Sequence, residues 1–126
     1  MDFSGKWEIY AQENHEEFLQ KMEVPQMLVK MMKDVKPVTV IEQNGDDFTI
    51  KIQTSLRTVT NSFTVGRESE MTSMDGRKFQ CTPSLEDGKL VITTEKFTSM
   101  RKIIGEDMIE TISAGSTVMT RRSRRV

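Results

Sequence analysis

The chain has 126 residues, which suits one domain with one hydrophobic core. Hydrophobic residues make up 36% and the formal net charge is −1, so no overall field favours a nucleic acid partner. The single cysteine excludes an intramolecular disulfide and indicates a reducing compartment. No apolar run has the pattern of a signal peptide or approaches the roughly 20 residues that span a bilayer. We therefore expect a soluble, cytoplasmic protein.

Residues 6–13 form the first predicted element, a strand. Their side chains alternate between apolar and polar, and Trp7, Ile9 and Ala11 share the apolar face. A period of two is typical of a strand with one buried face, so this segment should place an aromatic side chain in the core.

Two short helices are predicted next. Asn14 followed by Glu17 has the pattern of a capping box, which predicts a helix over about residues 15–23. Pro25 has the fixed φ of a first helical turn, so a second helix is expected over about residues 26–34. Two helices placed so early would form a cap over one end of the strands that follow.

After the helices the period of two continues to the end of the chain. Turn signals divide this part into hairpins at Asn44-Gly45, Gly66, Asp75-Gly76, Asp87-Gly88, Gly105 and Gly115, with weaker turns expected at residues 55–57 and 95–96. Counting the first strand, we expect ten strands in all. Antiparallel strands at this spacing favour an up-and-down β-barrel over a sandwich, because closure removes exposed edges. The prediction is an all-β barrel with a helical cap, in a single domain over residues 1–126.

Several segments of the chain resemble one protein family. They are residues 3–7 (FSGKW), 10–14 (YAQEN), 33–39 (KDVKPVT), 59–66 (VTNSFTVG), 72–76 (TSMDG), 88–91 (GKLV) and 120–126 (TRRSRRV). Together they are similar to the intracellular lipid-binding proteins, the fatty acid-binding protein family, and most of all to its liver basic branch, also called the liver bile acid-binding proteins. The resemblance implies a lipocalin-like, ten-stranded barrel, a helix-turn-helix lid and a water-filled cavity for fatty acids or bile salts, with neither a cofactor nor catalysis.

The last predicted strand carries the first candidate for the ligand site. Met119, Arg121 and Ser123 alternate on one face of it. The resemblance places Arg121 and Ser123 inside the barrel, where a guanidinium can hold a ligand carboxylate and a hydroxyl can donate one hydrogen bond. The alternative is a solvated basic tail, because four arginines crowd the last six residues.

An earlier strand carries a second candidate. Phe97, Ser99 and Arg101 share a face, and an inward Phe97 brings the other two with it. In muscle-type members of the family, the position of Arg101 resembles an internal arginine that holds the ligand carboxylate. The alternative, a surface arginine, would turn Lys102 inward, which is unfavourable for a lysine. Two cations inside a dry barrel would cost several kcal/mol each, so the site needs water, a carboxylate or both.

Other residues on predicted inward faces complete the candidate ligand site. They are Thr39, Asn61, Thr72, Met74, Ile50, Phe63 and Met119. For each of them, ordinary filling of the barrel is the alternative. His15 has no neighbours at metal-ligand spacing, and its pairing with Cys81 as a nucleophile is not expected, so neither a metal site nor a catalytic residue is predicted.

These features favour a monomeric carrier that binds long-chain fatty acids or bile salts noncovalently inside a capped barrel. One alternative is a carrier of another hydrophobic anion, such as a retinoid. Another is a module that delivers ligand to a nuclear receptor, with some of the protein in the nucleus. Basic lid residues would suit transient contact with anionic membranes, or an ordinary solvated face; they are Lys21, Lys30, Lys33 and Lys36.

Overall fold

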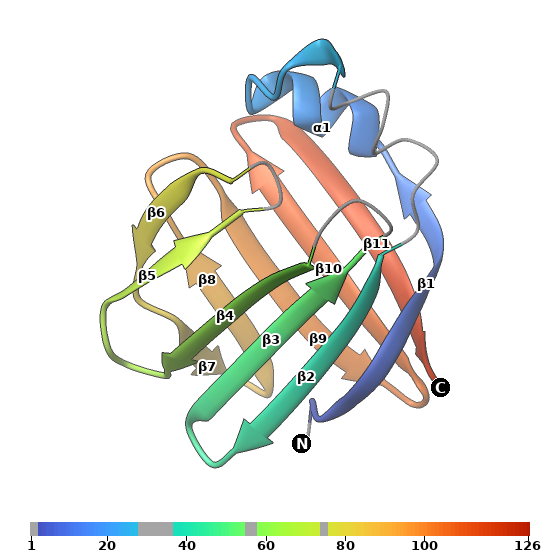
Figure 1. The fold of residues 1–126 in the computed structure, drawn as a ribbon. Helices are drawn as coiled ribbons and strands as arrows, with labels where there is room; N and C mark the ends of the chain where they lie inside the picture. The colour runs from blue at the N-terminus through green and yellow to red at the C-terminus, as the bar shows by residue number, and fades with distance from the viewer. Residues whose placement is uncertain (1–2, 28–36, 55–57, 74–75) are drawn as a thin grey trace.

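The computed structural model describes residues 3–27, 37–54, 58–73 and 76–126, which contain the strands β1 to β11 and the helix α1 (Figure 1). The elements in chain order are β1 (Gly5–Glu13), α1 (His15–Lys21), β2 (Val38–Asn44), β3 (Asp47–Gln53), β4 (Thr58–Thr64), β5 (Ser69–Thr72), β6 (Lys78–Cys81), β7 (Ser84–Glu86), β8 (Lys89–Thr93), β9 (Thr98–Ile104), β10 (Asp107–Ala114) and β11 (Thr117–Arg125). Within the described ranges, no helix combines the length and the apolar character that crossing a membrane requires.

The strands form two antiparallel sheets around one interior. Nine strands make a single curled sheet in the order β4-β3-β2-β1-β11-β10-β9-β8-β7, and β5 and β6 pair with each other beside β4. Strand β1 pairs with β11, so the first and last strands lie side by side, and α1 lies over one end of the curled sheet (Figure 1). The predicted fold class, an up-and-down β-barrel capped by helix, is confirmed.

The number of strands differs from the prediction at one place. A single strand was expected between the turns at residues 76 and 87, but the structure has β6 and β7 there, separated by Thr82 and Pro83. Proline has no backbone N–H to donate to a ladder. The interruption divides the segment into β6, which pairs with β5, and β7, which pairs with β8.

The inward face of β1 changes at a β-bulge. The pairing with β11 shifts register between Ile9 and Ala11, which leaves Tyr10 as the extra residue. Beyond the bulge, Gln12 and not Ala11 stands opposite Arg121. The prediction that Ala11 continues the apolar face of the strand is therefore wrong, because the bulge inserts one residue into an otherwise regular alternation.

Tyr10, the bulged residue, points outward and is held by its neighbours. Its hydroxyl donates to Asp107 Oδ2 at 2.8 Å, and the Arg124 guanidinium carbon lies 4.7 Å from the centre of its ring. The hydrogen bond to the Asp107 carboxylate, followed by smaller effects of burial and charge, raises the pKa of Tyr10. These contacts tie β1 to β10 and β11 on the outside of the barrel.

Helix α1 begins as predicted after Asn14, but without a capping box. Asn14 has a left-handed backbone (φ 59°, ψ 22°), and its side chain makes no capping bond to the helix in the described structure. Its Nδ2 instead donates to the Val118 carbonyl at 3.2 Å, which ties the start of α1 to β11. Phe18 and Leu19 are the buried residues of α1. The second predicted helix is helical at residues 26 and 27, and the rest of its range lies outside the described residues.

An apolar cluster fills the end of the barrel away from α1. It includes the buried aromatic side chains of Phe3, Trp7 and Phe48. The Trp7 indole Nε1 donates to the Phe3 carbonyl at 3.0 Å, and the Arg125 guanidinium carbon lies 4.5 Å from the centre of the indole ring. Packing at this end leaves the space for a ligand in the half of the barrel that α1 covers.

Candidate functional site

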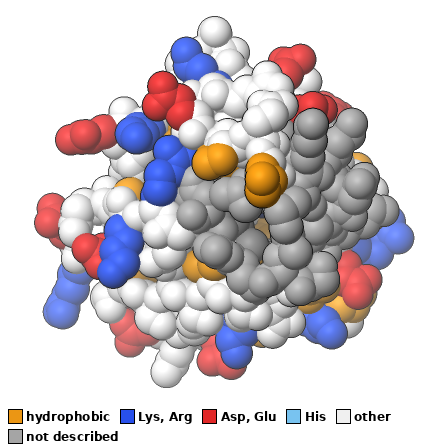
Figure 2. Space-filling model, turned by 45° about the horizontal axis from the view of Figure 1, so that its top comes forward, with side chains coloured by type: hydrophobic (Ala, Val, Ile, Leu, Met, Phe, Trp, Pro, Cys, Tyr) orange, Lys and Arg blue, Asp and Glu red, His pale blue; other side chains and the backbone are white. Residues whose placement is uncertain are grey.

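A cavity of about 470 Å³ lies under α1, in the size range of small-molecule sites in proteins. Helix α1 and the strands β3, β4, β5, β6 and β8 to β11 all contribute to its wall. The wall is largely apolar, and among its members are Phe18, Ile50, Met71, Phe97, Ile112 and Met119. On the face that carries α1, a few apolar side chains are exposed, with Lys and Arg side chains near them (Figure 2).

Three charged side chains meet in this apolar wall. Arg101 on β9, Glu110 on β10 and Arg121 on β11 lie on one rung of the sheet, because Glu110 is the register partner of both arginines. Residues directly opposite each other in antiparallel strands project from the same face, so all three point into the barrel. We call these three residues the charged centre.

The two arginines share the carboxylate of Glu110 unequally. Arg101 Nη2 lies 2.7 Å from Glu110 Oε2, whereas Arg121 Nη1 lies 3.7 Å from Glu110 Oε1. The three side chains are only 9%, 15% and 10% exposed for Arg101, Arg121 and Glu110. The distances give Arg101 a direct charge-assisted hydrogen bond and leave Arg121 with a longer, weaker ion pair.

The charged centre keeps one positive charge and two unused donors. Two guanidiniums and one carboxylate sum to +1. The buried Nε groups of Arg101 and Arg121 have no hydrogen-bond partner within the part of the chain that the structure describes. A buried donor without a partner costs about 1–3 kcal/mol, so this centre is suited to a second carboxylate, one supplied by a ligand.

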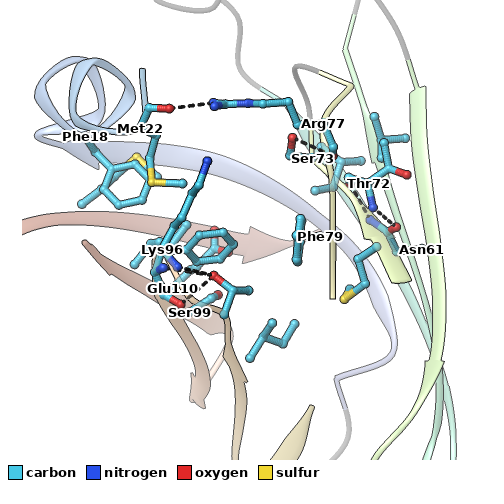
Figure 3. A pocket seen from close by; sticks show the side chains of 18 of the residues that line it. Phe18, Met22, Asn61, Thr72, Ser73, Arg77, Phe79, Lys96, Ser99 and Glu110 are labelled. Atoms are coloured by element: carbon cyan, nitrogen blue, oxygen red, sulfur yellow. Dashed lines mark hydrogen bonds between the residues drawn. The ribbon is translucent and has the colours of Figure 1, made fainter. Parts of the chain in front are cut away.

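Ser99 and the turn before it shape the wall next to the charged centre. Ser99 is buried and lines the cavity together with Phe97. The turn is fixed because Thr94 Oγ1 accepts the backbone N–H groups of Lys96 and Phe97 at 3.1 and 3.0 Å. As Figure 3 shows, Ser99 and Glu110 lie on the wall opposite Asn61 and Thr72.

Contacts with α1 complete the mouth of the cavity. Arg77 Nη2, from the β5–β6 hairpin, donates to the Met22 carbonyl at the end of α1 at 2.8 Å (Figure 3). Phe79 and Phe97 both line the cavity, and their rings contact each other edge to face with their centres 5.4 Å apart. Lys96 stands at the same opening. The mouth is therefore apolar with a basic rim.

Most of the predicted site residues are brought together by the fold. Those that line the cavity are Arg121, Arg101, Ser99, Asn61, Thr72, Ile50 and Met119. The interior placement of both arginines is confirmed, while their role toward a ligand stays a prediction. Met74 lies outside the described residues.

Three predicted residues point inward but do not line the cavity. Thr39, Phe63 and Ser123 are buried, with exposed fractions of 7%, 5% and 4%. The Phe63 ring stacks on Phe48, 5.4 Å away, in the packed end of the barrel. Alternation along a strand identifies the inward face correctly, but it does not tell how far along the barrel the cavity extends.

Several residues that line the cavity were not predicted, and among them Glu110 and Arg77 make the polar contacts described above. Glu110 had a signal in the sequence, because it alternates with Met108, Ile112 and Ala114 on the inward face of β10. A carboxylate in an apolar alternation marks a buried charge that needs a partner. A carboxylate beside the two interior cations is therefore supplied by the protein itself, from Glu110.

Among the described residues, no three His, Cys, Asp or Glu side chains are grouped so that they could hold a metal ion. Cys81 is a free cysteine, and burial raises the pKa of its thiol.

Comparison with known proteins gives consistent matches over the whole chain. Residues 1–126 match the family described as the lipocalin / cytosolic fatty-acid binding protein family. The liver fatty acid-binding protein of Schroederichthys bivius is 52% identical, with full coverage of both chains. A solved zebrafish ileal bile acid-binding protein in complex with cholic acid is 40% identical, with a TM-score of 0.85 and 98% of each chain covered. A solved fatty acid transporter, REP1-NXSQ, has a TM-score of 0.95 at 27% identity, with 99% of this chain and 96% of that chain covered.

Proposed function

Because the chain belongs to the lipocalin / cytosolic fatty-acid binding protein family, we propose that it is a carrier of long-chain fatty acids. The ligand would be held noncovalently in the cavity under α1 and released without chemical change. The observation that carries this proposal is the charged centre, which places a net positive charge and unused donors inside an apolar wall. A fatty acid has the complementary parts, one carboxylate and one apolar chain.

The apolar chain of the ligand would supply most of the affinity. Burial contributes about 0.8 kcal/mol per methylene group, so a long acyl chain supplies on the order of 10 kcal/mol before the costs of association. Hydrogen bonds between the carboxylate and a charged donor add about 1.5–3 kcal/mol. We infer that the wall sets affinity, while the charged centre selects an acid and fixes its orientation.

Arg121 is the residue that we expect to receive the ligand carboxylate. Its guanidinium is 3.7 Å from Glu110, a full ångström farther than that of Arg101, so it is less committed to the internal carboxylate. Ser99 lines the same wall and has a hydroxyl to donate. Ile50 and Met119 would contact the chain of the ligand.

Bile salts are the second candidate ligand class. The solved relative with cholic acid, at 40% identity, favours them. A bile salt presents the same carboxylate to the charged centre but carries hydroxyl groups on its ring system. Each hydroxyl that enters an apolar wall without a partner is unfavourable, which is why we place fatty acids first.

The compartment, the oligomeric state and the membrane contacts of the carrier are also proposals. We propose a cytoplasmic monomer that collects and releases ligand at anionic membranes. The basic side chains of Arg77, Lys78 and Lys96 at the mouth, and of Lys21 at the end of α1, would be attracted to such a surface. The alternative, delivery to a nuclear receptor inside the nucleus, would require a surface that changes when ligand is bound.

Competitive displacement tests the ligand class. Delipidated protein is loaded with a fluorescent fatty acid, and oleate and cholate are titrated against it. We expect both to displace the probe, with oleate effective at the lower concentration. Displacement by cholate alone would make bile salts the ligand class, and no binding of the probe would overturn the proposed function.

A further inference from the structure

Glu110 is a carboxylate that the protein itself places beside the position proposed for the ligand carboxylate. It lies between the two interior arginines on one rung of the sheet, as the register partner of Arg101 on β9 and of Arg121 on β11. Its side chain is 10% exposed, and Arg101 Nη2 lies 2.7 Å from its Oε2. Glu110 thus lowers the charge of the charged centre from the +2 of its two arginines to +1.

The surroundings of the charged centre add no second buried charge. Among the residues that the structure describes, the charged side chains classed as buried are Arg101 and Glu110, and Leu90, fully buried, continues the rung on the far side of Arg101. The other charged residues of the described wall lie at the mouth, and none of them is buried; they are Arg77, Lys78, Glu95 and Lys96. Charges in contact with water are screened by solvent and salt, so the charged centre alone must balance the charge of a deeply bound head group.

The charge of a ligand head group therefore decides whether the wall is left neutral. A head group with one negative charge brings the charged centre from +1 to zero. A head group with two negative charges leaves a net charge of −1 in an apolar wall, which is unfavourable without a partner. The second charge is also repelled by Glu110, and this repulsion is strong because the surroundings are less polar than water.

We propose that Glu110 is a specificity-determining residue, which admits lipids with a singly charged head group and excludes lipid phosphate monoesters from the interior site. A carboxylate carries one charge, whereas a phosphate monoester has a second pKa of about 6 and carries nearly two charges above pH 7. The inference rests on the proposed function and deepens it, since it states the charge that the carried lipid must have. Arg121 attracts the anion, and Glu110 limits its charge to one.

A pair of ligands separates the charge of the head group from its shape. Hexadecyl sulfate and hexadecyl phosphate have the same chain and a tetrahedral head group, but at pH 8 the sulfate carries one charge and the phosphate two. Each is titrated against a fluorescent fatty acid on delipidated protein, below the concentration at which micelles form. Adding one proton to the phosphate two pH units above its pKa costs a factor of about 100 in affinity. We expect the phosphate to bind about 10- to 100-fold more weakly than the sulfate.

Proton uptake provides a second readout on the unchanged protein. The phosphate binds in the interior only when the complex takes up a proton, on the phosphate itself or on Glu110, because the wall is then neutral. Calorimetric titrations in two buffers with different heats of ionisation should therefore give different heats for the phosphate and equal heats for the sulfate. We expect about one proton to be taken up for each bound phosphate at pH 8.

Three variants test whether Glu110 is the cause. Glu110→Gln keeps the shape of the side chain and raises the charge of the centre to +2, so the preference for the sulfate should fall about tenfold or more and the proton uptake should disappear. Arg101→Gln with Glu110→Gln returns the charge to +1 and should restore the preference. Glu106→Gln is the matched control, because it removes the same charge from the exposed turn before β10, and it should change the preference by less than about twofold.

Palmitate, titrated in the same way, distinguishes failure of this inference from failure of the proposed function. If palmitate binds but the sulfate and the phosphate bind equally well at pH 8, or the preference is the same in Glu110→Gln, the carrier function stands and the role of Glu110 is wrong. If none of the three ligands binds, both are wrong. Should Glu110→Gln fail to fold, the calorimetry of the unchanged protein decides, and heats of phosphate binding that do not depend on the buffer would contradict the inference.

Discussion

Glu110→Gln is expected to lower the free energy of unfolding by about 3 kcal/mol, since breaking a buried ion pair costs about 3–5 kcal/mol. The substitution keeps the shape of the side chain and removes the negative charge that Arg101 and Arg121 share. Two buried cations then face each other without a counter-charge. Urea denaturation of delipidated protein, followed by the fluorescence of Trp7, measures the loss. Oleate should raise the unfolding midpoint more in Glu110→Gln than in the unchanged protein, because its carboxylate replaces the missing one.

A double-mutant cycle provides the control for this prediction. Arg101→Gln with Glu110→Gln removes the whole pair and returns the charged centre to the net charge of +1 that it has in the unchanged protein. The double variant should be more stable than the sum of the two single losses predicts, by more than about 1 kcal/mol. Strictly additive losses would contradict the ion pair as the cause.

Arg121→Leu is expected to weaken the binding of oleate by about 10- to 100-fold, which corresponds to a charge-assisted hydrogen bond of about 1.5–3 kcal/mol. Binding of oleyl alcohol, which has the same chain and no charge, should change by less than about threefold, because burial of the chain is unaffected. Calorimetric titration of both ligands measures the difference.

Arg122→Leu is the matched control for the ligand experiment. Arg122 follows Arg121 on β11 but is exposed on the outer face of the barrel. Its substitution removes the same formal charge from the same strand, so it tests whether overall charge or the interior position matters. Equal losses of acid and alcohol binding in Arg121→Leu, or a selective loss of acid binding in Arg122→Leu, would contradict the proposed role of Arg121.

Local patterns in the sequence predict most of the fold. The period of two after Pro37 and the glycine turns predict the order of the hairpins. In a barrel, consecutive hairpins bring the last strand, β11, beside the first strand, β1, and the structure has this pairing. The departures are the bulge at Tyr10, the break at Pro83 and the left-handed Asn14. The bulge and the left-handed Asn14 depend on partners distant in sequence, such as the Val118 carbonyl that accepts the Asn14 side chain, and a local pattern does not contain those partners. The break at Pro83 follows from the missing N–H of proline, a local signal that the sequence does contain.

The site is predicted in part, for a related reason. Alternation on β9 and β11 places Arg101 and Arg121 on inward faces, and the structure agrees. The two arginines meet because Glu110 is the register partner of each of them, across β9, β10 and β11. That register is set by strand pairing in the folded sheet, so alternation within one strand does not predict it. The apolar alternation of β10 does mark Glu110 as inward. Arg77, by contrast, makes a tertiary contact with the end of α1 that no residue spacing in the sequence predicts.

The most direct test concerns where the acid group of a bound ligand lies. Oleate labelled with carbon-13 at its carboxyl carbon is bound to the delipidated protein, and its NMR signal is recorded while a soluble paramagnetic relaxation agent is added. If the carboxylate lies beside Arg121, deep in the wall, its signal stays sharp while that of free oleate broadens. A bound carboxyl signal that broadens as readily as the free one would place the acid group in solvent and contradict an interior anion site.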